Sequence, residues 1–311
     1  MFVVCGEALM DIYPSSEDTP TGLLLDARVG GSPFNVAVGL ARLAQPVAFF
    51  GAISTDIPGE RLMRALQGEG VACDAVARPA APTTLGFVGL DDQGSPAYTF
   101  HGEGAADRQL GMDALATLPP RMRALHVGSY ATVVEPIAST LRALVAREHG
   151  RTPICFDPNI RPAVEPDIDR WRDLVRWMLP RCDLLKISEE DLQLLRPGVN
   201  LTHFAGAALA AGVGLVVVTR GSEGACAWSP TGEAQVEATA VEVVDSVGAG
   251  DAFQAALLAW LCEQDKLSLE TLRSLGSEDM ERALRFASDA AGIACGRRGA
   301  DLPRRADLPA D

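Results

Sequence analysis

The chain has 311 residues, of which 48% are hydrophobic and 22% are charged, and this composition is typical of a globular protein with a sizeable core. Its 27 basic and 41 acidic residues give a net charge of −14. Such a charge argues against nucleic acid as a partner, because phosphate backbones bind basic surfaces. Small anionic ligands stay open, since backbone N–H groups bind phosphate in acidic proteins too.

Neither the cysteines nor the N-terminus points to export or to a metal site. The seven cysteines form no C-x-x-C pair and the four histidines no H-E-x-x-H, so we expect free thiols and no protein-built zinc site. The first residues have no basic flank and include Glu7 and Asp11, unlike a signal peptide. The longest apolar stretch, Phe204–Val218, is too short to span a bilayer. We therefore expect a cytoplasmic protein with no membrane partner.

Short apolar runs alternate with segments of helical periodicity along the chain. The runs that predict buried strands are residues 2–6, Val47–Ile53, Ala124–Ser129, Pro153–Asp157, Asp183–Ser188 and Gly214–Thr219. The predicted helices are Asn35–Ala44, Gly59–Gly70, Ile137–Gly150 and Asp169–Leu179. Continuous apolar runs indicate strands covered on both faces. The sequence thus predicts one α/β domain over residues 1–311, with a doubly wound, mostly parallel sheet and helices on both faces.

Two regions in the first third break this alternation. Residues 8–31 and 83–104 resemble β-hairpin material, and the second contains a "DDQG" turn. We interpret them as a small β lid, inserted in the domain and covering one end of the main sheet. The final residues, "LPRRADLPAD", are expected to form a surface tail.

Polar motifs follow the predicted strands, and open parallel sheets bind ligands beyond the carboxyl ends of their strands. These motifs are Asp11, Gly30–Ser32, Asp157–Pro162, Lys186–Asp191, Thr219–Gly224 and Asp245–Asp251. There is no G-x-x-x-x-G-K-[ST], so a Walker-type ATPase is excluded.

The motif Asp245–Asp251, "DSVGAGD", combines small residues with a following helix. Gly248, Ala249 and Gly250 let a ligand approach the backbone closely, and a helix N-terminus attracts anions. An aspartate there repels phosphate unless it has a role. Asp251 is either an N-cap or the base that takes a proton from a hydroxyl attacking phosphate. On these residues alone, capping is the favoured interpretation.

The other motifs each have two interpretations. Thr219–Gly224 is either a nucleotide loop or a β-hairpin turn. Lys186 could offset phosphate charge and Glu189 could hold magnesium through water, or both belong to an acidic helix start capped by Ser188. Asn35 is either a sugar ligand or a turn and cap residue.

The order and spacing of these motifs resemble the ribokinase-like (PfkB) family of carbohydrate kinases. Gly30–Leu62 looks like the family's N-terminal signature and Asp245–Leu258 like its highly specific C-terminal one. The stretches "GEALMDIYP", "DPNIRP", "KISEEDL" and "GRRGA" are most similar to fructokinases. The resemblance covers about residue 3 to residue 303.

This resemblance implies an ATP-dependent transfer of phosphate to a sugar hydroxymethyl group, most specifically from ATP to fructose, giving fructose 6-phosphate. Magnesium would arrive with ATP, and many members also bind a monovalent cation such as K⁺. The resemblance further implies a lid that closes over the sugar and, in some members, forms a homodimer. The implied residues fall into four groups. They are Asp251 as base with Gly248, Ala249 and Gly250 as anion hole; Asp11, Gly31, Asn35 and Arg161 for sugar; Lys186, Glu189, Thr219, Gly221, Gly224 and Ser288 for nucleotide; and Asp245, Val247, Ala294, Arg297 and Gly299 for the monovalent cation.

Three departures from fructokinases keep the substrate open. Ser32 and Phe34 stand where small alanines are common, which changes a pocket wall. His101 and Gly102 replace a tyrosine and an arginine, which removes an expected sugar or acid contact. Ser288 leaves the preferred nucleotide base open. The alternatives are a kinase for 2-keto-3-deoxygluconate, ribose or a nucleoside, and, in another class, a non-catalytic sugar-binding regulator.

Overall fold

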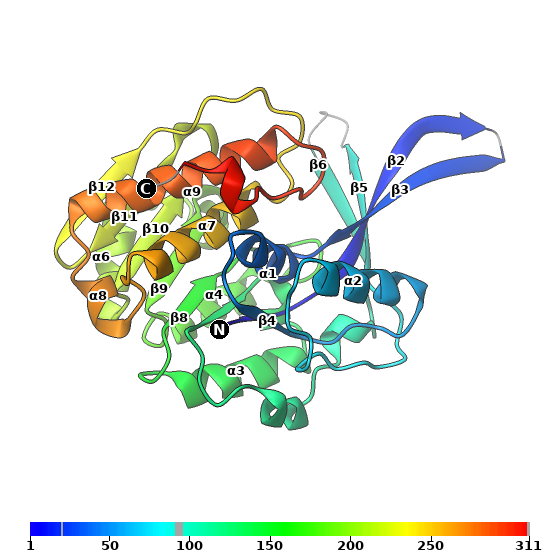
Figure 1. Ribbon diagram of the computed structural model, residues 1–311, viewed down its shortest axis with the longest axis horizontal. Helices are drawn as coiled ribbons and strands as arrows, with labels where there is room; N and C mark the ends of the chain where they lie inside the picture. The colour runs from blue at the N-terminus through cyan, green and yellow to red at the C-terminus, as the bar shows by residue number, and fades with distance from the viewer. Residues whose placement is uncertain (20, 91–95, 310–311) are drawn as a thin grey trace.

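The computed structural model describes residues 1–19, 21–90 and 96–309, and its centre is an eight-stranded sheet (Figure 1). The strand order is β12-β11-β10-β9-β8-β7-β1-β4. Neighbouring strands from β4 to β10 pair in parallel, and β11 and β12 add an antiparallel edge. The strands are β1 Phe2–Cys5, β4 Val47–Phe50, β7 Ala124–Gly128, β8 Ile154–Asp157, β9 Leu184–Ser188, β10 Leu215–Thr219, β11 Ala225–Ser229 and β12 Gly232–Val236. The predicted mostly parallel sheet is confirmed.

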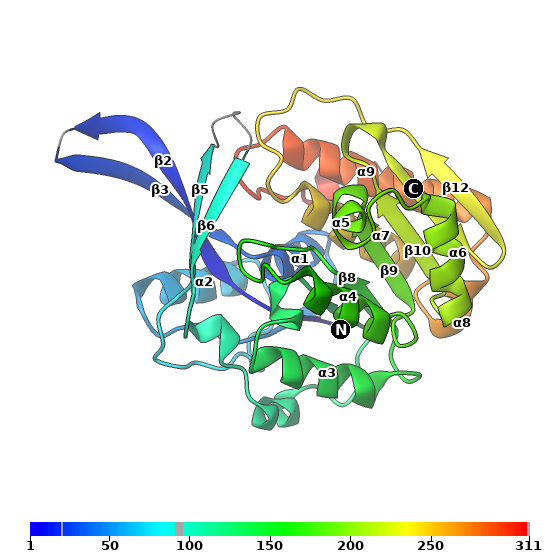
Figure 2. The same cartoon turned by 180° about the vertical axis from the view of Figure 1, so that it is seen from behind.

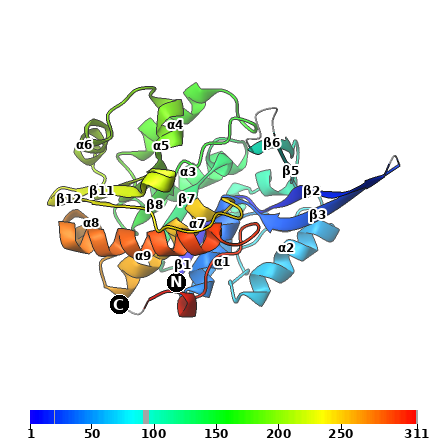
Figure 3. The same cartoon turned by 90° about the horizontal axis from the view of Figure 1, so that it is seen from above.

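Helices cover both faces of this sheet, as Figure 3 shows from above. One layer holds α1 Ser32–Arg42, α2 Ile57–Gly68, α7 Ala249–Glu263, α8 Leu269–Arg273 and α9 Ser277–Cys295. The other, in front of the sheet in Figure 2, holds α3 Ile137–Glu148, α4 Ile168–Met178, α5 Glu189–Leu195 and α6 Leu201–Ala211. Among the described residues, none of these helices has the length and apolar character needed to cross a membrane.

Alternate residues of each strand point into two separate cores, one on each side of the sheet. Val4 and Val217 belong to the core under α1 and α7, whereas Val3 and Val218 belong to the core under α3 and α4. All four side chains are buried. This explains the continuous apolar runs in the sequence, because a strand covered on both faces has no solvent-facing positions.

A second sheet, with strand order β3-β2-β5-β6, projects from the α/β body (Figure 1). Its strands are β2 Leu9–Thr19, β3 Gly22–Gly30, β5 Leu85–Leu90 and β6 Pro96–His101, and we call it the flap sheet. They fall within the two regions interpreted as a lid, and the predicted "DDQG" turn lies outside the described residues. Because β2 follows β1 after a few residues, the base of the flap sheet lies at the carboxyl end of β1.

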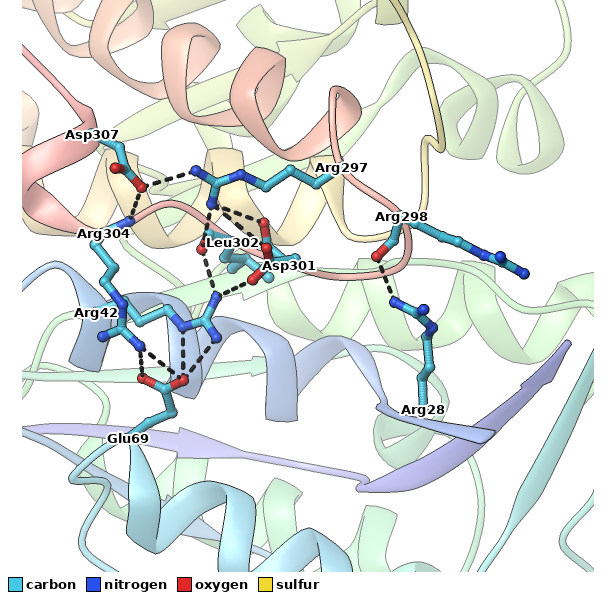
Figure 4. Close-up of polar contacts among 9 residues, drawn as sticks. All are labelled: Arg28, Arg42, Glu69, Arg297, Arg298, Asp301, Leu302, Arg304 and Asp307. Atoms are coloured by element: carbon cyan, nitrogen blue, oxygen red, sulfur yellow. Dashed lines mark hydrogen bonds and ion pairs between the residues drawn. The ribbon is translucent and has the colours of Figure 1, made fainter. Parts of the chain in front are cut away.

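The C-terminal segment is not the free surface tail that the sequence suggested. Leu302 and Leu308 are 1% and 6% exposed, and Leu302 packs with Ala252 of α7 and Ala294 of α9. The backbone carbonyl of Leu302 accepts a hydrogen bond of 2.6 Å from Arg42 of α1 (Figure 4). Buried leucines and polar contacts together therefore fix the segment against the body of the protein.

Candidate active site

Asp251 lies in the first turn of α7, and it does not cap the helix. The N-cap is Gly248, which has a left-handed backbone (φ 80°), and no side chain caps this end. The buried Asp251 carboxylate instead accepts hydrogen bonds of 2.6 Å from Ser32 Oγ and 2.8 Å from Asn35 Nδ2. The capping interpretation is therefore wrong, and α1 and α7 meet at this carboxylate.

The surroundings of Asp251 increase its tendency to accept a proton. Burial raises its pKa, and the hydrogen bonds from Ser32 and Asn35 and the charges of Lys186 and Arg161 offset only part of that rise. The two donors also fix the direction of the carboxylate. Asp251 is thus a buried carboxylate with a fixed orientation and an elevated pKa. A general base requires these properties.

The start of α7 is crowded and positively charged. A Cβ on Gly248 would lie 2.9 Å from Ala300 Cα, and a Cβ on Gly250 would lie 3.3 Å from Lys186 Nζ. The first N–H groups of a helix have no partner within the helix and carry its positive dipole end. The Ala249 N–H, between the two glycines, donates a 3.2 Å hydrogen bond to the Ser246 carbonyl, and the Lys186 ammonium lies beside Gly250 in the first turn of α7.

A buried carboxylate on the neighbouring strand stabilises the positive charge of Lys186. Its Nζ donates a 2.8 Å hydrogen bond to Asp157 Oδ2, and both side chains are almost fully buried. Burial lowers the pKa of Lys186, but Asp157, Asp191 and Asp251 outweigh it, so the net pKa is raised. The ammonium consequently stays protonated beside the helix N-terminus.

Asp11 approaches the same volume from the base of the flap sheet. It is 8% exposed, and burial raises its pKa to about 7, with Arg161 acting against the rise and Asp251 and Asp245 adding to it. Within the described part of the chain its carboxylate has no hydrogen-bond or ion-pair partner. Gly31, at the N-cap of α1, follows the strand that pairs with Asp11.

Arg161 lies in the loop after β8 and links the acidic groups of the site. Its charge lowers the pKa of Asp11, Asp251 and Asp191. Its loop is fixed by Asp191 of α5, whose Oδ1 accepts the Ile160 N–H at 3.2 Å. Burial raises the pKa of Asp191 to about 6. The structure thus brings Asp11, Asn35, Arg161 and Asp251 together.

The predicted nucleotide residues lie along the carboxyl ends of β9 and β10. Thr219 ends β10 and is the register partner of Ser188, which directly precedes Glu189. Gly221 begins a short 3-10 turn between β10 and β11 and Gly224 follows it, so a β-hairpin is present as well. Glu189, at the start of α5, accepts a hydrogen bond of 3.2 Å from Arg220 Nε. Ser288 lies apart from both strands and is buried in α9.

The predicted cation residues come from two segments that contact each other: the loop before α7, with Asp245 and Val247, and the end of α9 with the loop after it, with Ala294, Arg297 and Gly299. Asp245 Oδ1 accepts the Val247 N–H at 3.0 Å, and its Oδ2 accepts the Gly299 N–H at 2.8 Å. The Ala294 carbonyl accepts the Arg297 N–H at 3.0 Å. No group of three or more His, Cys, Asp or Glu side chains in the described residues forms a metal cluster. A cation here would therefore depend on carbonyl oxygens and one carboxylate.

Arginines of α1, of β3 and of the segment itself hold the segment that contains Gly299 (Figure 4). Arg42 of α1 pairs with Glu69 and Asp301 at 2.7 Å each, and Arg297 pairs with Asp307 at 3.0 Å. Arg28 of the flap strand β3 donates a 2.8 Å hydrogen bond to the Arg298 carbonyl. These contacts fix the Gly299 N–H that Asp245 accepts.

Several residues of this site were missed because their role depends on a partner distant in sequence. Ser32 and Asp157 lay inside the motifs quoted above, but no periodicity indicates that they bond Asp251 and Lys186. Arg220 lay between Thr219 and Gly221, and its pairing with Glu189 required β9 and β10 to be neighbours. Glu7, fully buried with its pKa raised to about 7 by burial, had no signal beyond its place after β1.

The chain resembles carbohydrate kinases over nearly its full length. Residues 1–307 match the model of the pfkB family of carbohydrate kinases. Among curated proteins, a fructokinase of Rhizobium leguminosarum bv. trifolii is 38% identical over 308 residues, covering 98% of this chain and 91% of that protein. A fructokinase of Escherichia coli is 32% identical over 315 residues, covering 99% of this chain and 98% of that protein.

Solved structures agree with this assignment. The fructokinase of Vibrio cholerae O395 in its fructose-, ADP- and calcium-bound form is 30% identical with a TM-score of 0.81, covering 96% of this chain and 94% of that one. The fructokinase of Xylella fastidiosa with bound ATP is 26% identical with a TM-score of 0.83, covering 99% and 94%. The ribokinase-like fold predicted from the sequence is confirmed, and this chain belongs to the pfkB family of carbohydrate kinases.

Proposed function

We propose that this protein is an ATP-dependent fructokinase, which transfers the γ-phosphoryl group of ATP to the hydroxymethyl group of fructose and forms fructose 6-phosphate. The observation that carries this proposal is the buried Asp251 carboxylate, held by Ser32 and Asn35 at the N-terminus of α7 and close to Lys186. The similarity to fructokinases, including one with fructose and ADP bound, supports fructose as the acceptor.

In the proposed reaction, Asp251 takes the proton as the fructose hydroxyl oxygen attacks the γ-phosphorus and the bond to the ADP oxygen breaks. The N–H groups of Gly248, Ala249 and Gly250 and the Lys186 ammonium stabilise the negative charge on the transferred group. Asp11, Gly31, Asn35 and Arg161 hold the sugar in line. Positioning and charge neutralisation supply most of the catalysis in phosphoryl transfer, so this set of residues is sufficient.

On the nucleotide side, we propose that Thr219, Gly221 and Gly224 line the phosphates and ribose, with Lys186 near the transferred phosphate and Ser288 on the adenine side. A magnesium ion bound with ATP would neutralise phosphate charge, and the donor set fits it: Glu189 uses Oε2 for Arg220, which leaves Oε1 to accept from a metal-bound water. The structure of a putative E. coli ribokinase II with ATP and Mg²⁺ supports this choice of metal.

We further propose a K⁺ site formed by Asp245 and the carbonyls of Val247, Ala294, Arg297 and Gly299. The Asp245 carboxylate and the ordered Gly299 loop support it. A double mutant of the Vibrio cholerae O395 fructokinase, crystallised with fructose, ADP and potassium ion bound, supports this choice of cation. The test is the dependence of activity on added K⁺ with Na⁺ as control, for the native protein and for Asp245→Asn. A native protein equally active without K⁺ would contradict this site.

The proposed lid has an apolar surface that suits a homodimer. Leu23, Leu24 and Leu25 of β3 are 61%, 55% and 40% exposed, and β3 is the outer strand of the flap sheet. We propose that two copies pair through this surface, because an exposed strand edge with large apolar side chains favours association. Light scattering of the native protein and of Leu23→Glu tests this proposal. A monomeric mass for the native protein at every concentration would contradict it.

The experiment that tests the proposed function is a ranking of kcat/KM with ATP, Mg²⁺ and K⁺ for fructose, 2-keto-3-deoxygluconate, ribose and adenosine. We expect fructose to rank first. A higher kcat/KM for another acceptor would contradict fructose while retaining the kinase assignment. Fructose binding without ATP consumption would instead favour a non-catalytic sugar-binding regulator.

A further inference from the structure

Gly102, which follows the flap strand β6, faces the side chain of Arg108. A Cβ built on Gly102 would lie 2.9 Å from Arg108 Nη2 and 2.7 Å from Thr84 Oγ1. Arg108 ends a short 3-10 turn, Ala106–Arg108, that returns toward β6. The guanidinium therefore occupies the space that a side chain at position 102 would fill, and glycine at 102 makes room for it.

Arg108 is held beside an aromatic ring and lacks a partner of its own. Its Cζ lies 5.9 Å from the centroid of the buried Tyr130 ring. Its Nε is buried and has no hydrogen bond, and the guanidinium has no ion pair in the described part of the chain. By contrast, Arg42 pairs with Glu69 and Asp301. A desolvated donor without an acceptor is unfavourable, so this guanidinium fits an acceptor that comes from outside the chain.

A continuous row of side chains leads from Arg108 to the proposed sugar site. The Tyr130 ring contacts Phe100 of β6, edge to face, with centroids 6.2 Å apart. Phe100 Cε1 and Asp11 Oδ1 lie 3.0 Å and 3.2 Å from the same point, the Cβ position of Gly86 on β5. Arg108 and Asp11 thus stand at the two ends of one short row along the base of the flap sheet.

Asp107, the acidic neighbour of Arg108, forms no ion pair with it; burial raises the pKa of Asp107, and its hydrogen bonds and the charge of Arg108 offset only part of that rise. Asp107 accepts hydrogen bonds of 2.5 Å from Thr84 Oγ1 and 2.8 Å from the Tyr130 hydroxyl, so both of its oxygens are occupied. These bonds fix the turn that carries Arg108. The guanidinium is therefore positioned by Asp107 and Tyr130 without being neutralised through a direct ion pair.

We propose that Arg108 is a specificity-determining residue that donates hydrogen bonds to oxygen atoms of the sugar at the end remote from the phosphorylated hydroxymethyl group. The inference rests on the proposed function and adds the residue that holds the far end of fructose. The ligand chemistry is an oxygen acceptor, and we commit to the hydroxyl groups of a neutral ketohexose rather than to a carboxylate.

Steady-state kinetics of Arg108→Met and Arg108→Lys test this proposal. Methionine keeps an apolar contact with Tyr130 but removes the donors, and we expect KM for fructose to rise about 10- to 100-fold, as for the loss of a charged hydrogen bond. We expect the KM for ATP to change less than about twofold, with partial recovery of the fructose KM in Arg108→Lys. Gln109→Met is the matched control, because Gln109 is exposed at the next position and its side chain donates a hydrogen bond to the Gly104 carbonyl, away from Tyr130.

A second measurement separates sugar contact from a structural role. Gly102→Ala should displace the guanidinium and raise KM for fructose, and its effect should shrink in the Arg108→Met background, where only the contact with Thr84 remains. Additive effects of the two changes would overturn the proposal, as would a fructose KM within about twofold of native in Arg108→Met. If the KM for 2-keto-3-deoxygluconate rose in Arg108→Met and the KM for fructose did not, the acceptor would be a carboxylate and our choice of hydroxyls would be wrong.

A native enzyme that does not phosphorylate fructose would refute the proposed function itself. Titration of the preferred acceptor into Arg108→Met would then decide the role of Arg108.

Discussion

The N-terminus of α7 and the base of the flap sheet each direct a buried aspartate into the same site, and they differ in how that aspartate is held. Asp251 accepts hydrogen bonds from Ser32 and Asn35, so its direction is set before any ligand binds. Asp11 has no such partner in the described residues, and burial raises its pKa to about 7. This contrast indicates that the α7 end is arranged for chemistry, whereas the flap end is completed by the substrate.

The largest expected effect comes from removing the proposed base. Asp251→Asn keeps the size of the side chain and one oxygen for the Ser32 or Asn35 bond, but it cannot accept a proton. We expect kcat to fall by about 10²–10⁴ with the fold retained. The measurement is kcat with saturating fructose and ATP, with circular dichroism as the check on folding. A variant within a few-fold of native would show that the α7 carboxylate is only structural.

The second effect concerns the buried Lys186 ammonium beside the N-terminus of α7. Lys186→Met leaves Asp157 buried without its partner, and we expect a loss of about 3–5 kcal/mol in the free energy of unfolding. Urea titration measures it, with Arg285→Met as control, because Arg285 pairs with Glu281 at the surface and its loss should cost about 0–1 kcal/mol. Equal losses in both variants would contradict a buried, uncompensated Asp157.

A smaller effect is expected at the flap end. Asp11→Asn removes the negative charge and one of the two acceptor oxygens that we assign to fructose hydroxyls, so KM for fructose should rise about 10-fold or more while kcat changes less. Steady-state kinetics with fructose as the varied substrate measure this. If kcat fell as far as in Asp251→Asn and KM stayed constant, the proposed division between the two ends would be wrong.

The pKa of Asp11 predicts the mildest effect, a pH dependence of sugar binding. The ionised carboxylate accepts hydroxyl hydrogen bonds, so KM for fructose should fall about tenfold between pH 6 and pH 8 as Asp11 loses its proton near pH 7. Asp11→Asn should flatten this profile. An unchanged profile in the variant would assign the titration to another group.

The stability of the unliganded protein should follow the opposite course. Folding raises the pKa of Asp11, so its bound proton contributes stability that is fully present below the ordinary carboxyl range and is lost as the pH rises through about 7. Glu7, whose pKa burial also raises to about 7, adds to the same trend. We therefore expect the melting temperature to fall from pH 6 to pH 8, with a smaller fall in Asp11→Asn.

Features that depend on local pattern were predictable from the sequence. Continuous apolar runs identified the parallel strands because both faces of the sheet are buried, and the small residues before α7 identified its N-terminus. The role of Asp251 was not predictable from the motif Asp245–Asp251 alone, since capping is a local property and the real partners of Asp251, Ser32 and Asn35, lie more than 200 residues away. The resemblance to a family supplied what the local pattern lacked.

The C-terminal segment and Arg108 show where sequence reasoning fails for a physical reason. Residues 302–309 have many charges, yet Leu302 and Leu308 are buried because α1 and α7 form a surface for them. Gly102 looked like the loss of a cation, whereas the folded chain places the Arg108 guanidinium in the vacated space. In both cases the decisive neighbour is set by tertiary packing and leaves no periodic signal.

The most direct test of the central claim is a calorimetric titration of fructose into Asp251→Asn. If the α7 end performs the chemistry and the flap end holds the sugar, the dissociation constant should stay within about fivefold of native, while turnover is lost. A dissociation constant raised by about 100-fold or more would contradict the account, because Asp251 would then hold the sugar rather than accept its proton.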